Sequence, residues 1–415
     1  MKQPHVKPRV CVIQDGSRQK YMVQLALQHS HILHRTFNEW FCRKGSWEEK
    51  FSRMVEKINP TLGRQMAERS CAELDDSLVL TNSLMALWMP FYMKRFKTSD
   101  EAFAWRMGRL AKWFLRAGFG DCNALYGYVR TALPEVFREA HARGLRTAAD
   151  QMIAPLRVEA AELKIQVERF PGWIARESLE MDQRTLSLEE NAWGELDRIT
   201  AMSQYVKDGL ISVGVAAEKV EVIPYPWLET VPQEPRKFNR DRPLTVGFVG
   251  AVGLRKGTPY FLEIARRFRS KKLRFVMLGG ILLNPQKLEP YSDIVEFVPH
   301  VPRSVVLKWL KEFDVFLFPT TCEGSAGAAV EAMAMSLPVL TSANCGSRAR
   351  DGIEGFIRRY DDIDGYCEAL HRLNDDRDLL QTMGTAARQR ALAYTLKEYE
   401  VDMLHFFENL LNPPM

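Results

Sequence analysis

The sequence predicts an α/β protein with two Rossmann-like domains in tandem, and three observations support this. Its 415 residues correspond to two or three domains at roughly 150 residues per domain. Hydrophobic residues at 46% and charged residues at 26% are the proportions of an ordinary globular protein. Short apolar segments alternate with helical segments through the second half, which is typical of a parallel sheet covered on both faces. Two such sheets are expected to face each other across a cleft at their carboxyl ends.

The first half begins as an α/β domain often does. Residues 9–13 predict a buried strand, residues 14–17 a turn, and residues 19–28 a helix. The part that follows is strongly helical. Further strands are predicted at 74–81, 147–151, 198–202 and 220–224, with a helix at 203–213.

A segment rich in Pro, Arg and Asp, residues 229–243, predicts an interdomain linker. Strands of the second half are predicted at 244–249, 273–278, 294–297, 315–319 and 339–341. We therefore expect an N-terminal domain at 1–228, a C-terminal domain at 229–395, and an amphipathic helix within 396–415.

The composition argues against several classes of protein. Seven cysteines without a CxxC pair predict neither a zinc site nor a disulfide framework, and they fit a reducing cytosol. A net charge of +5 without a clustered basic face predicts no nucleic-acid partner. No apolar run approaches the length of about 20 residues that spans a bilayer, and the run 10–13 is no signal-peptide core. We expect a cytoplasmic protein that is not integral to the membrane.

A glycine-rich loop follows the first strand of the second half. Gly247, Gly250 and Gly253 have the spacing of a dinucleotide fingerprint. Such a site needs a helix that starts inside the glycine run and an acidic residue at the end of the next strand. Here Thr258 and Pro259 indicate a helix that starts after the loop, and the next strand ends in two glycines. A dehydrogenase is therefore not expected.

The same loop carries Arg255, Lys256 and Gly257. Arg can bind phosphate oxygens in bidentate fashion, Lys adds a point charge, and a following helix N-terminus favours anions. Glycine lets the backbone approach the ligand closely. These residues predict a diphosphate site, and the alternative is a solvated basic turn.

Two glutamates stand in the segment FDVFLFPTTCEGSAGAAVEAMAMSLPVLTS, residues 313–342. Glu323 lies in the loop after a buried strand, and Glu331, eight positions later, lies about one turn inside a helix of small residues. Both carboxylates would face the crevice, where they can accept hydrogen bonds from sugar or ribose hydroxyls. Unpaired amides at the helix start can bind a phosphate. Taken singly, each glutamate also fits an ordinary surface position.

Together these segments resemble glycosyltransferase family 4, retaining enzymes of the GT-B fold. The resemblance runs from about residue 199 to 392, and it is closest in FVGAVGLRKG, HVPRS, the glutamate segment and CGSRARDGIEGFI. It implies two facing Rossmann-like domains and a nucleotide-diphosphate-sugar donor. It also implies that the helix at 396–411 returns to brace the N-terminal domain.

The resemblance implies which residues bind the donor. Glu323 would contact hydroxyls of the donor sugar, Glu331 the ribose, and Arg255 with Lys256 the diphosphate. Backbone groups near the base and in the first N-terminal loop would complete the site. The expected donor-binding residues are Gly16, Gly250, Arg255, Lys256, Val301, Glu323, Gly324, Ser325, Ala326, Gly327 and Glu331.

Two positions depart from the family pattern. Many relatives carry an additional Arg shortly after the glycine-ended strand, where this chain has Ala251. Relatives often place a His beside the sugar at the end of an N-terminal strand, where this chain has Gln151, while His141 lies in a helical run with an expected surface position. Either Gln151 positions the donor sugar or the catalytic assignment fails. The expected catalytic residues are Glu323, Gln151, Lys256 and Arg255.

The predicted function is transfer of a sugar from a nucleotide-diphosphate-sugar to an acceptor hydroxyl, with retention, in glycan or cell-surface polysaccharide biosynthesis. No metal or other cofactor is expected, because Arg255 and Lys256 supply positive charge. The expected partners are the nucleotide sugar and a glycan or lipid-linked acceptor. The alternative is a non-catalytic nucleotide-sugar-binding or scaffolding protein, which Gln151 and Ala251 would suit. A sugar phosphorylase or epimerase of related architecture is a third hypothesis.

One stretch, residues 83–119, mixes aromatic and basic side chains. They are Trp88, Phe91, Tyr92, Phe96, Trp105, Trp113 and Phe114, with Lys94, Arg95, Lys97, Arg106, Arg109, Lys112 and Arg116. On an amphipathic helix such residues can lie on an anionic membrane surface, here the inner face of the membrane. The favoured alternative is a core-facing stripe with a solvated opposite face.

Overall fold

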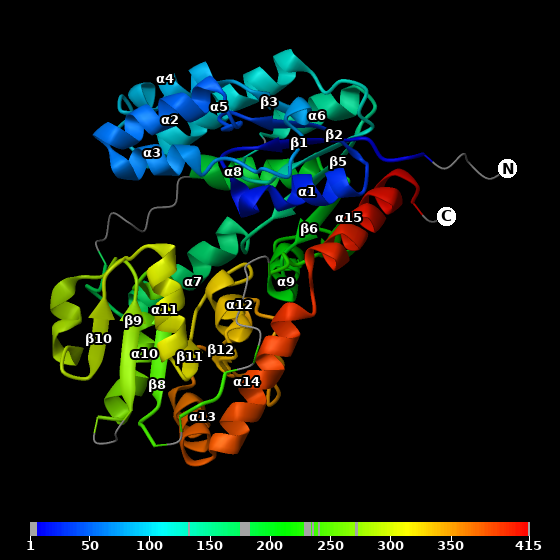
Figure 1. Ribbon diagram of the computed structural model, residues 1–415. Coiled ribbons are helices and arrows are strands. Elements are labelled where there is room, and N and C mark those ends of the chain that lie inside the picture. Colours follow the sequence, from blue (N-terminus) through cyan, green and yellow to red (C-terminus); the bar gives the residue numbers. More distant parts are fainter. Residues whose placement is uncertain are drawn as a thin grey trace.

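The computed structural model describes residues 6–131, 133–174, 183–227, 234, 236–239, 241–269 and 273–413. Two parallel sheets, one in each half of the chain, form the centres of two domains (Figure 1). The predicted α/β class with tandem Rossmann-like domains is confirmed. The linker predicted at 229–243 lies partly outside the described residues.

The described part of the N-terminal half forms a parallel sheet in the order β3-β2-β1-β4-β5-β6-β7. The strands are β1 (Val10–Gln14), β2 (Leu33–Asn38), β3 (Val79–Thr81), β4 (Ala124–Tyr128), β5 (Arg146–Gln151), β6 (Arg198–Ala201) and β7 (Val220–Val222). The strand order reverses between β1 and β4, so the carboxyl ends of these two strands flank a crevice suited to a ligand.

The helices of this half are η1 (Arg18–Tyr21), α1 (Met22–His29), α2 (Trp47–Ile58), α3 (Pro60–Ala67), η2 (Asp76–Leu78), α4 (Ser83–Met93), α5 (Ser99–Ala117), α6 (Pro134–Ala142), α7 (Leu156–Arg169), α8 (Gln183–Gly194), α9 (Gln204–Ser212) and η4 (Ala217–Lys219). Most of them lie around its sheet, whereas α7 lies toward the C-terminal domain (Figure 1).

Sequence patterns predicted this half incompletely. Strands β2 and β4 were not expected, because β2 contains the polar residues His34 and Arg35 and β4 contains Gly127. The strand expected at 74–81 is extended only from Val79 onward, after the short helix η2.

The described C-terminal half forms a parallel sheet in the order β10-β9-β8-β11-β12-β13. The strands are β8 (Thr245–Val249), β9 (Arg274–Leu278), β10 (Val295–Val298), β11 (Val315–Phe318), β12 (Val339–Thr341) and β13 (Gly355–Ile357). The five predicted strands are confirmed to within a residue or so at each end. Strand β13 was missed because it has only three residues and begins with glycine.

The helices of the C-terminal half begin with the short turn that carries the basic pair. They are η5 (Leu254–Lys256), α10 (Thr258–Arg267), η6 (Pro285–Lys287), η7 (Glu289–Tyr291), α11 (Arg303–Glu312), α12 (Gly327–Ala334), η8 (Ala343–Cys345), α13 (Ile363–Asp375), α14 (Arg377–Leu392) and α15 (Leu396–Leu411). None of the described helices, in either half, is both long and apolar enough to cross a membrane.

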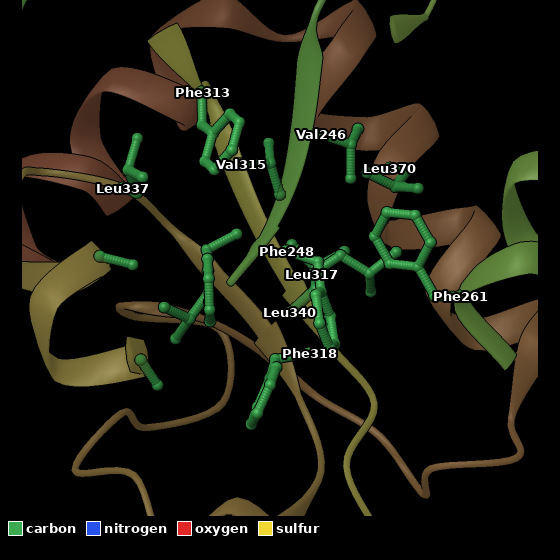
Figure 2. Close-up of a cluster of buried hydrophobic side chains, with 14 of the residues drawn as sticks. Val246, Phe248, Phe261, Phe313, Val315, Leu317, Phe318, Leu337, Leu340 and Leu370 are labelled. Atoms are coloured by element: carbon green, nitrogen blue, oxygen red, sulfur yellow. The ribbon is translucent and has the colours of Figure 1, made fainter. Parts of the chain in front are cut away.

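The core of the C-terminal domain explains one glycine of the apparent dinucleotide fingerprint. Figure 2 shows Val246 of β8, Leu317 of β11 and Phe313, which precedes β11, among the buried side chains. A Cβ at Gly247 would collide with the Phe313 ring. Gly247 is therefore required by packing between β8 and the start of β11.

Two helices pack against the domain that is formed by the other half of the chain. Helix α7 follows β5 but packs against η5 and the C-terminal core. There the Tyr260 hydroxyl donates to Gln166 Oε1 at 2.6 Å, and Arg169 Nη1 donates to Asp361 Oδ2 at 2.8 Å. Helix α15 lies beside α1 (Figure 1) and buries Phe407 in the N-terminal core.

Candidate functional site

Two adjoining cavities are lined by loops from both domains. The larger, of about 550 Å³, is lined by Arg18 and residues after β4 and β5 on one side and by Glu323 on the other. The smaller, of about 390 Å³, is lined by Lys20, Trp227, Arg303 and Glu331 among others. The two linings share Gln19, Met202 and Ser325. The predicted cleft at the carboxyl ends of the sheets is therefore present.

Glu323 is held by both cations of the glycine-rich loop. Its Oε1 accepts a hydrogen bond from Lys256 Nζ and lies 3.2 Å from Arg255 Nη1. The same guanidinium donates to the Cys322 carbonyl oxygen at 2.9 Å. The structure thus brings the adjacent cations Arg255 and Lys256 into contact with Glu323, which lies far from them in the sequence.

Gly257 determines how closely this basic loop approaches Glu323. Its φ of 71° ends η5 in the left-handed region, which favours glycine. A Cβ at this position would collide with the Pro319 carbonyl oxygen at the end of β11. Any larger residue would therefore move Arg255 and Lys256 away from the carboxylate.

Glu331 lies on α12 and pairs with Arg303, the first residue of α11. Both residues line the smaller cavity together with Gly327, where α12 begins. The first-turn amides of such a helix have no acceptor within it and carry partial positive charge. The Ala326 amide, just before the helix, donates to the Cys345 carbonyl oxygen at 3.0 Å. Of the predicted helix-start residues, Gly327 and Ser325 line the cavities and Ala326 does not.

Gly16 lies in the first N-terminal loop, but its backbone groups are bonded within the N-terminal domain. Its amide lies 3.2 and 3.1 Å from the two carboxylate oxygens of Glu39. Its carbonyl oxygen accepts from Gln14 Nε2 at 2.8 Å and from Asn38 Nδ2 at 3.1 Å. Gly16 therefore shapes this loop, and Arg18 and Gln19 are the residues of the loop that reach the larger cavity.

A buried charge cluster anchors the loop. Asp15 accepts from Arg18 Nε at 2.7 Å, from Arg106 Nη1 at 3.0 Å and from Thr131 Oγ1 at 2.6 Å. Burial alone would raise the pKa of Asp15, but these partners outweigh it and lower the pKa to about 2. Asp15 is thus ionised throughout the physiological range and fixes Arg18 at the cavity wall.

Three consecutive residues of the loop have left-handed backbone conformations. The φ angles are 48° at Gln19, 51° at Lys20 and 62° at Tyr21. Each costs a non-glycine residue roughly 1–2 kcal/mol, and such strain persists only where the surroundings enforce it. The buried Tyr21 ring packs edge-on against Phe41 at 5.2 Å. This conformation explains why α1 begins at Met22, three residues later than predicted.

Gln151, which the resemblance places where relatives often have a histidine, ends β5 and lines the larger cavity. Its amide nitrogen donates to the Ile153 carbonyl oxygen and to Glu189 Oε1, both at 2.9 Å. Its side-chain oxygen accepts from Trp193 Nε1 at 3.1 Å. Both amide protons are thus engaged, which leaves a lone pair of the oxygen for a ligand.

Asp150, one residue earlier, also lines the larger cavity and was not predicted. Tyr225, on the chain that leads to the C-terminal domain, donates to Asp150 Oδ2, and Thr200 donates to Oδ1 at 3.3 Å. Burial raises the pKa of Asp150 to about 7, although these hydrogen bonds oppose the shift.

Gly250 and Val301 lie outside both linings, as do Gly16, Arg255, Lys256 and Ala326 among the predicted donor residues. Gly250 follows β8, and its amide donates to the Leu278 carbonyl oxygen at 2.9 Å. A Cβ on Gly279 would collide with the Gly250 carbonyl oxygen, so Gly279 permits the close approach of the two chain segments that follow β8 and β9. Val301 precedes α11 and is half-buried, two residues before Arg303.

The two domains touch directly beside Glu323. The Ala154 amide lies 3.4 Å from the Glu323 carbonyl oxygen, and the Ser203 hydroxyl donates to the Gly324 carbonyl oxygen. A Cβ on Gly324 would collide with the Met152 carbonyl oxygen. The loop between β11 and α12, residues 319–326 (the glutamate loop), therefore contacts the loop after β5. A glycine at position 324 permits this contact.

Sequence patterns missed several residues of the cavity walls. Arg303 had a usable signal, because it follows Pro302 at a helix start on the same edge of the sheet as the glutamates. Arg18 and Trp227 had none, because a side chain in an irregular segment has no periodicity that would place it. Among the described residues, no three His, Cys, Asp or Glu side chains gather as a candidate metal site.

Residues 243–376 match the family model described as Glycosyl transferases group 1. A D-inositol 3-phosphate glycosyltransferase of Streptomyces griseus is 31% identical over 124 residues, covering 28% of this chain and 26% of that protein. The UDP-Gal:alpha-D-GlcNAc-diphosphoundecaprenol alpha-1,3-galactosyltransferase of Escherichia coli is 31% identical over 145 residues, covering 32% of this chain and 36% of that protein. The similarity thus spans about a quarter to a third of these relatives.

Similarity in structure extends over nearly the whole chain. Anabaena Alr3699/HepE, solved in complex with UDP-glucose, aligns with 96% of this chain and 98% of its own, with a TM-score of 0.58 and 13% identity. At this identity the similarity establishes the fold alone. The chain therefore has the GT-B fold, with a C-terminal domain related to glycosyl transferases group 1.

Proposed function

We propose that this protein is a retaining, metal-independent glycosyltransferase that moves a sugar from a nucleotide-diphosphate-sugar to an acceptor hydroxyl. The observation that carries the proposal is the convergence of Lys256 and Arg255 on Glu323, which lines a cavity between the two domains a few residues before α12. Cations, an orienting carboxylate and helix-start amides are the groups that a diphosphate and a sugar require.

In this proposal the donor spans both cavities. The sugar lies in the larger cavity, where Glu323 accepts from its hydroxyls, and the nucleoside lies in the smaller cavity, where Glu331 accepts from the ribose. The diphosphate lies between them at Ser325 and Gly327, whose segment contributes to the cavity walls. Bound phosphate oxygens draw Lys256 and Arg255 away from Glu323, which frees the carboxylate for the sugar.

Catalysis then rests on stabilising the departing diphosphate. Negative charge develops on it as the bond to the anomeric carbon breaks, and preorganised cations and amides stabilise that charge. Arg255 and Lys256 supply this charge, so the proposal needs no metal. Retention requires that the new bond form on the face from which the diphosphate leaves. Gln151, which also lines the larger cavity, is proposed to orient the sugar through its remaining oxygen lone pair.

The comparisons suggest the substrates to try first. UDP-glucose is bound by the Anabaena protein, and UDP-galactose and a lipid-linked sugar are named for the Escherichia coli relative. We propose a UDP-sugar donor and a glycan or lipid-linked acceptor, in glycan or cell-surface polysaccharide biosynthesis. We place the protein in the cytoplasm, because all seven of its cysteines are free thiols, as a reducing compartment maintains them.

The experiment is donor binding and turnover with a panel of nucleotide sugars. A donor should raise the unfolding temperature by mass action. Slow release of UDP should follow, and a chelator should not inhibit it, because the proposal needs no metal. Glu331→Gln should weaken donor binding by about tenfold or more, the loss of a charge-assisted hydrogen bond. Glu296→Gln is the matched control. Glu296, on β10, pairs with Arg274 of β9 and lies outside both cavities.

Three outcomes would contradict parts of the proposal. Equal donor affinity in Glu331→Gln and Glu296→Gln would remove Glu331 from the donor site. Tight binding without turnover, even with acceptors, would favour the non-catalytic alternative. A product whose anomeric configuration is inverted, as measured by NMR, would exclude retention.

A further inference from the structure

We propose that the exposed faces of α4 and of the α2–α3 hairpin form a docking face for an anionic lipid bilayer. The docking face consists of Leu84, Trp88, Phe91 and Tyr92 with Lys94, Arg95 and Lys97, flanked by Met54, Ile58 and Leu62. It lies on the N-terminal domain, outside both cavities of the candidate site.

Helix α4 presents an apolar stripe to solvent. Leu84, Trp88 and Phe91 stand at i, i+4 and i+7, which places them on one side of a helix, and they are 67%, 63% and 64% exposed. Met89 of α4 is buried in the N-terminal core. The prediction of a core-facing stripe is therefore wrong for these α4 residues, because the core takes the other side of the helix.

The prediction is confirmed for the following helix. On α5 the residues Met107, Leu110, Ala111 and Phe114 are buried in the N-terminal core, and Trp105 and Trp113 pack against it. The aromatic residues of α4 and α5 therefore have different surroundings. Those on α4, Trp88, Phe91 and Tyr92, are exposed and available to a partner outside the domain.

The α2–α3 hairpin enlarges the apolar area. Met54, Ile58 and Leu62 are exposed, Ile58 at 83%. The hairpin is tied to α4 because the Ser83 hydroxyl donates to Glu48 Oε1 at 2.8 Å. In Figure 1 these three helices lie together at one end of the N-terminal domain.

The charge pattern argues for a bilayer as the occupant. No Asp or Glu occurs from residue 77 to 99, whereas Lys94, Arg95 and Lys97 follow α4 and are all exposed. The Arg95 guanidinium lies over the Tyr92 ring at 4.8 Å. Trp and Tyr are enriched where hydrocarbon meets headgroups, and adjacent cations are attracted by anionic lipids. The apolar side chains of this surface therefore match the hydrocarbon region of such a membrane, and its cationic side chains match the anionic headgroups.

The docking face also connects to the candidate site. Helix α5 begins at Ser99, directly after the basic turn, and its Phe103 lines the larger cavity. A membrane bound at α4 would thus lie next to the N-terminal wall of the cleft. A membrane in this position would bring the head of a lipid-linked acceptor close to Glu323, an inference that rests on the proposed function.

The test is co-sedimentation of the full chain with vesicles. We expect binding to vesicles of phosphatidylglycerol mixed with phosphatidylcholine and much weaker binding to phosphatidylcholine alone, with loss in high salt. Trp88→Ser with Phe91→Ser, and separately Lys94→Glu with Lys97→Glu, should each reduce the bound fraction by about tenfold or more. Val401→Ser is the matched control, because Val401 is an exposed apolar residue of α15, far along the chain from α4.

No binding to anionic vesicles at low salt would overturn the proposal, as would equal binding by all the variants. A dimer in lipid-free solution that Trp88→Ser with Phe91→Ser dissociates would also overturn it, because the face would then be covered by a second copy. Donor turnover is measured in the same samples and should be unchanged in these variants. Vesicle binding without turnover would contradict the proposed function alone, and turnover without vesicle binding would contradict the docking face alone.

Discussion

At the scale of single residues, the two glutamates of the cleft are each matched to a cation. Glu323 pairs with Lys256 and Arg255, and Glu331 pairs with Arg303. These ion pairs keep both carboxylates in place while no donor is bound. In the proposed function, a donor would exchange these ion pairs for its own contacts with the protein, which would let the protein select for phosphate and hydroxyl groups together.

Asp150 predicts a pH dependence of stability. Burial raises its pKa from 3.8 to about 7, so between these values the folded protein binds a proton that the unfolded chain has released. Stability therefore falls as pH rises through this window, by up to roughly 4 kcal/mol for a shift of this size. In Asp150→Asn this contribution is absent.

Urea unfolding at pH 4, 5, 6 and 7 measures the effect. The free energy of unfolding of Asp150→Asn relative to wild type should increase steadily with pH. Asp208→Asn, on α9 and exposed to solvent, should track the wild type. A constant difference between Asp150→Asn and wild type across the range would mean that Asp150 is ionised in the folded protein.

At the scale of elements, α7 and α15 are exchanged between the domains. Helix α7 leaves the N-terminal sheet and supports η5, where Glu159 Oε1 lies 3.5 Å from Arg255 Nε. Helix α15 returns from the C-terminal domain and packs on α1. Each domain thus depends on a helix contributed by the other half of the chain, which ties the basic loop to the loop after β5.

The packing of α15 predicts a large effect for one side chain. Phe407 is fully buried and its ring lies 5.7 Å from Tyr126 of β4. Phe407→Ala should destabilise the protein by about 3–5 kcal/mol, the usual cost of removing a buried aromatic ring. Val401→Ala, on the exposed side of the same helix, should change stability by less than about 0.5 kcal/mol.

Chemical denaturation followed by circular dichroism distinguishes the two variants. Similar midpoints for Phe407→Ala and Val401→Ala would show that α15 does not pack on the N-terminal domain in solution.

At the scale of the whole molecule, contact between the domains depends on the small size of residue 324. Gly324→Ala places a methyl group against the Met152 carbonyl oxygen, so we expect the glutamate loop and the loop after β5 to separate. Donor binding, which the proposed function assigns mainly to the C-terminal domain, should change by less than about threefold. Turnover should fall by tenfold or more, because misplacing reacting groups by about 1 Å can cost a hundredfold.

Gly108→Ala is the matched control, because a Cβ there has nothing within 4 Å and Gly108 lies on α5, outside both cavities. Nucleotide affinity and turnover with the preferred donor are compared for both variants and the wild type. Unchanged turnover in Gly324→Ala, or an equal loss in Gly108→Ala, would show that this contact is unimportant for catalysis.

The fold was more predictable in the C-terminal half than in the N-terminal half, for a physical reason. Strands such as β8 and β11 are buried on both faces and appear as short apolar runs between helices. Strand β2 contains His34 and Arg35, and β4 contains Gly127, so neither gave such a signal. The site was predictable where motifs are local in sequence, as with Arg255, Lys256 and Glu323. Arg18, Asp150 and Trp227 reach the cavities only through the tertiary fold.

The sequence by itself determined the α/β class, the alternation that builds the parallel sheet of the second half, and the presence of a basic glycine-rich loop and of two glutamates eight positions apart. These properties depend on side-chain pattern and chain-local geometry, which neighbouring residues specify. Only the tertiary structure decided that Glu323 meets Lys256, that Gly324 touches Met152, and that Trp88 faces solvent while Phe114 faces the core. Such contacts depend on how distant segments pack, and packing is set by the shape of the whole core rather than by any one stretch of chain.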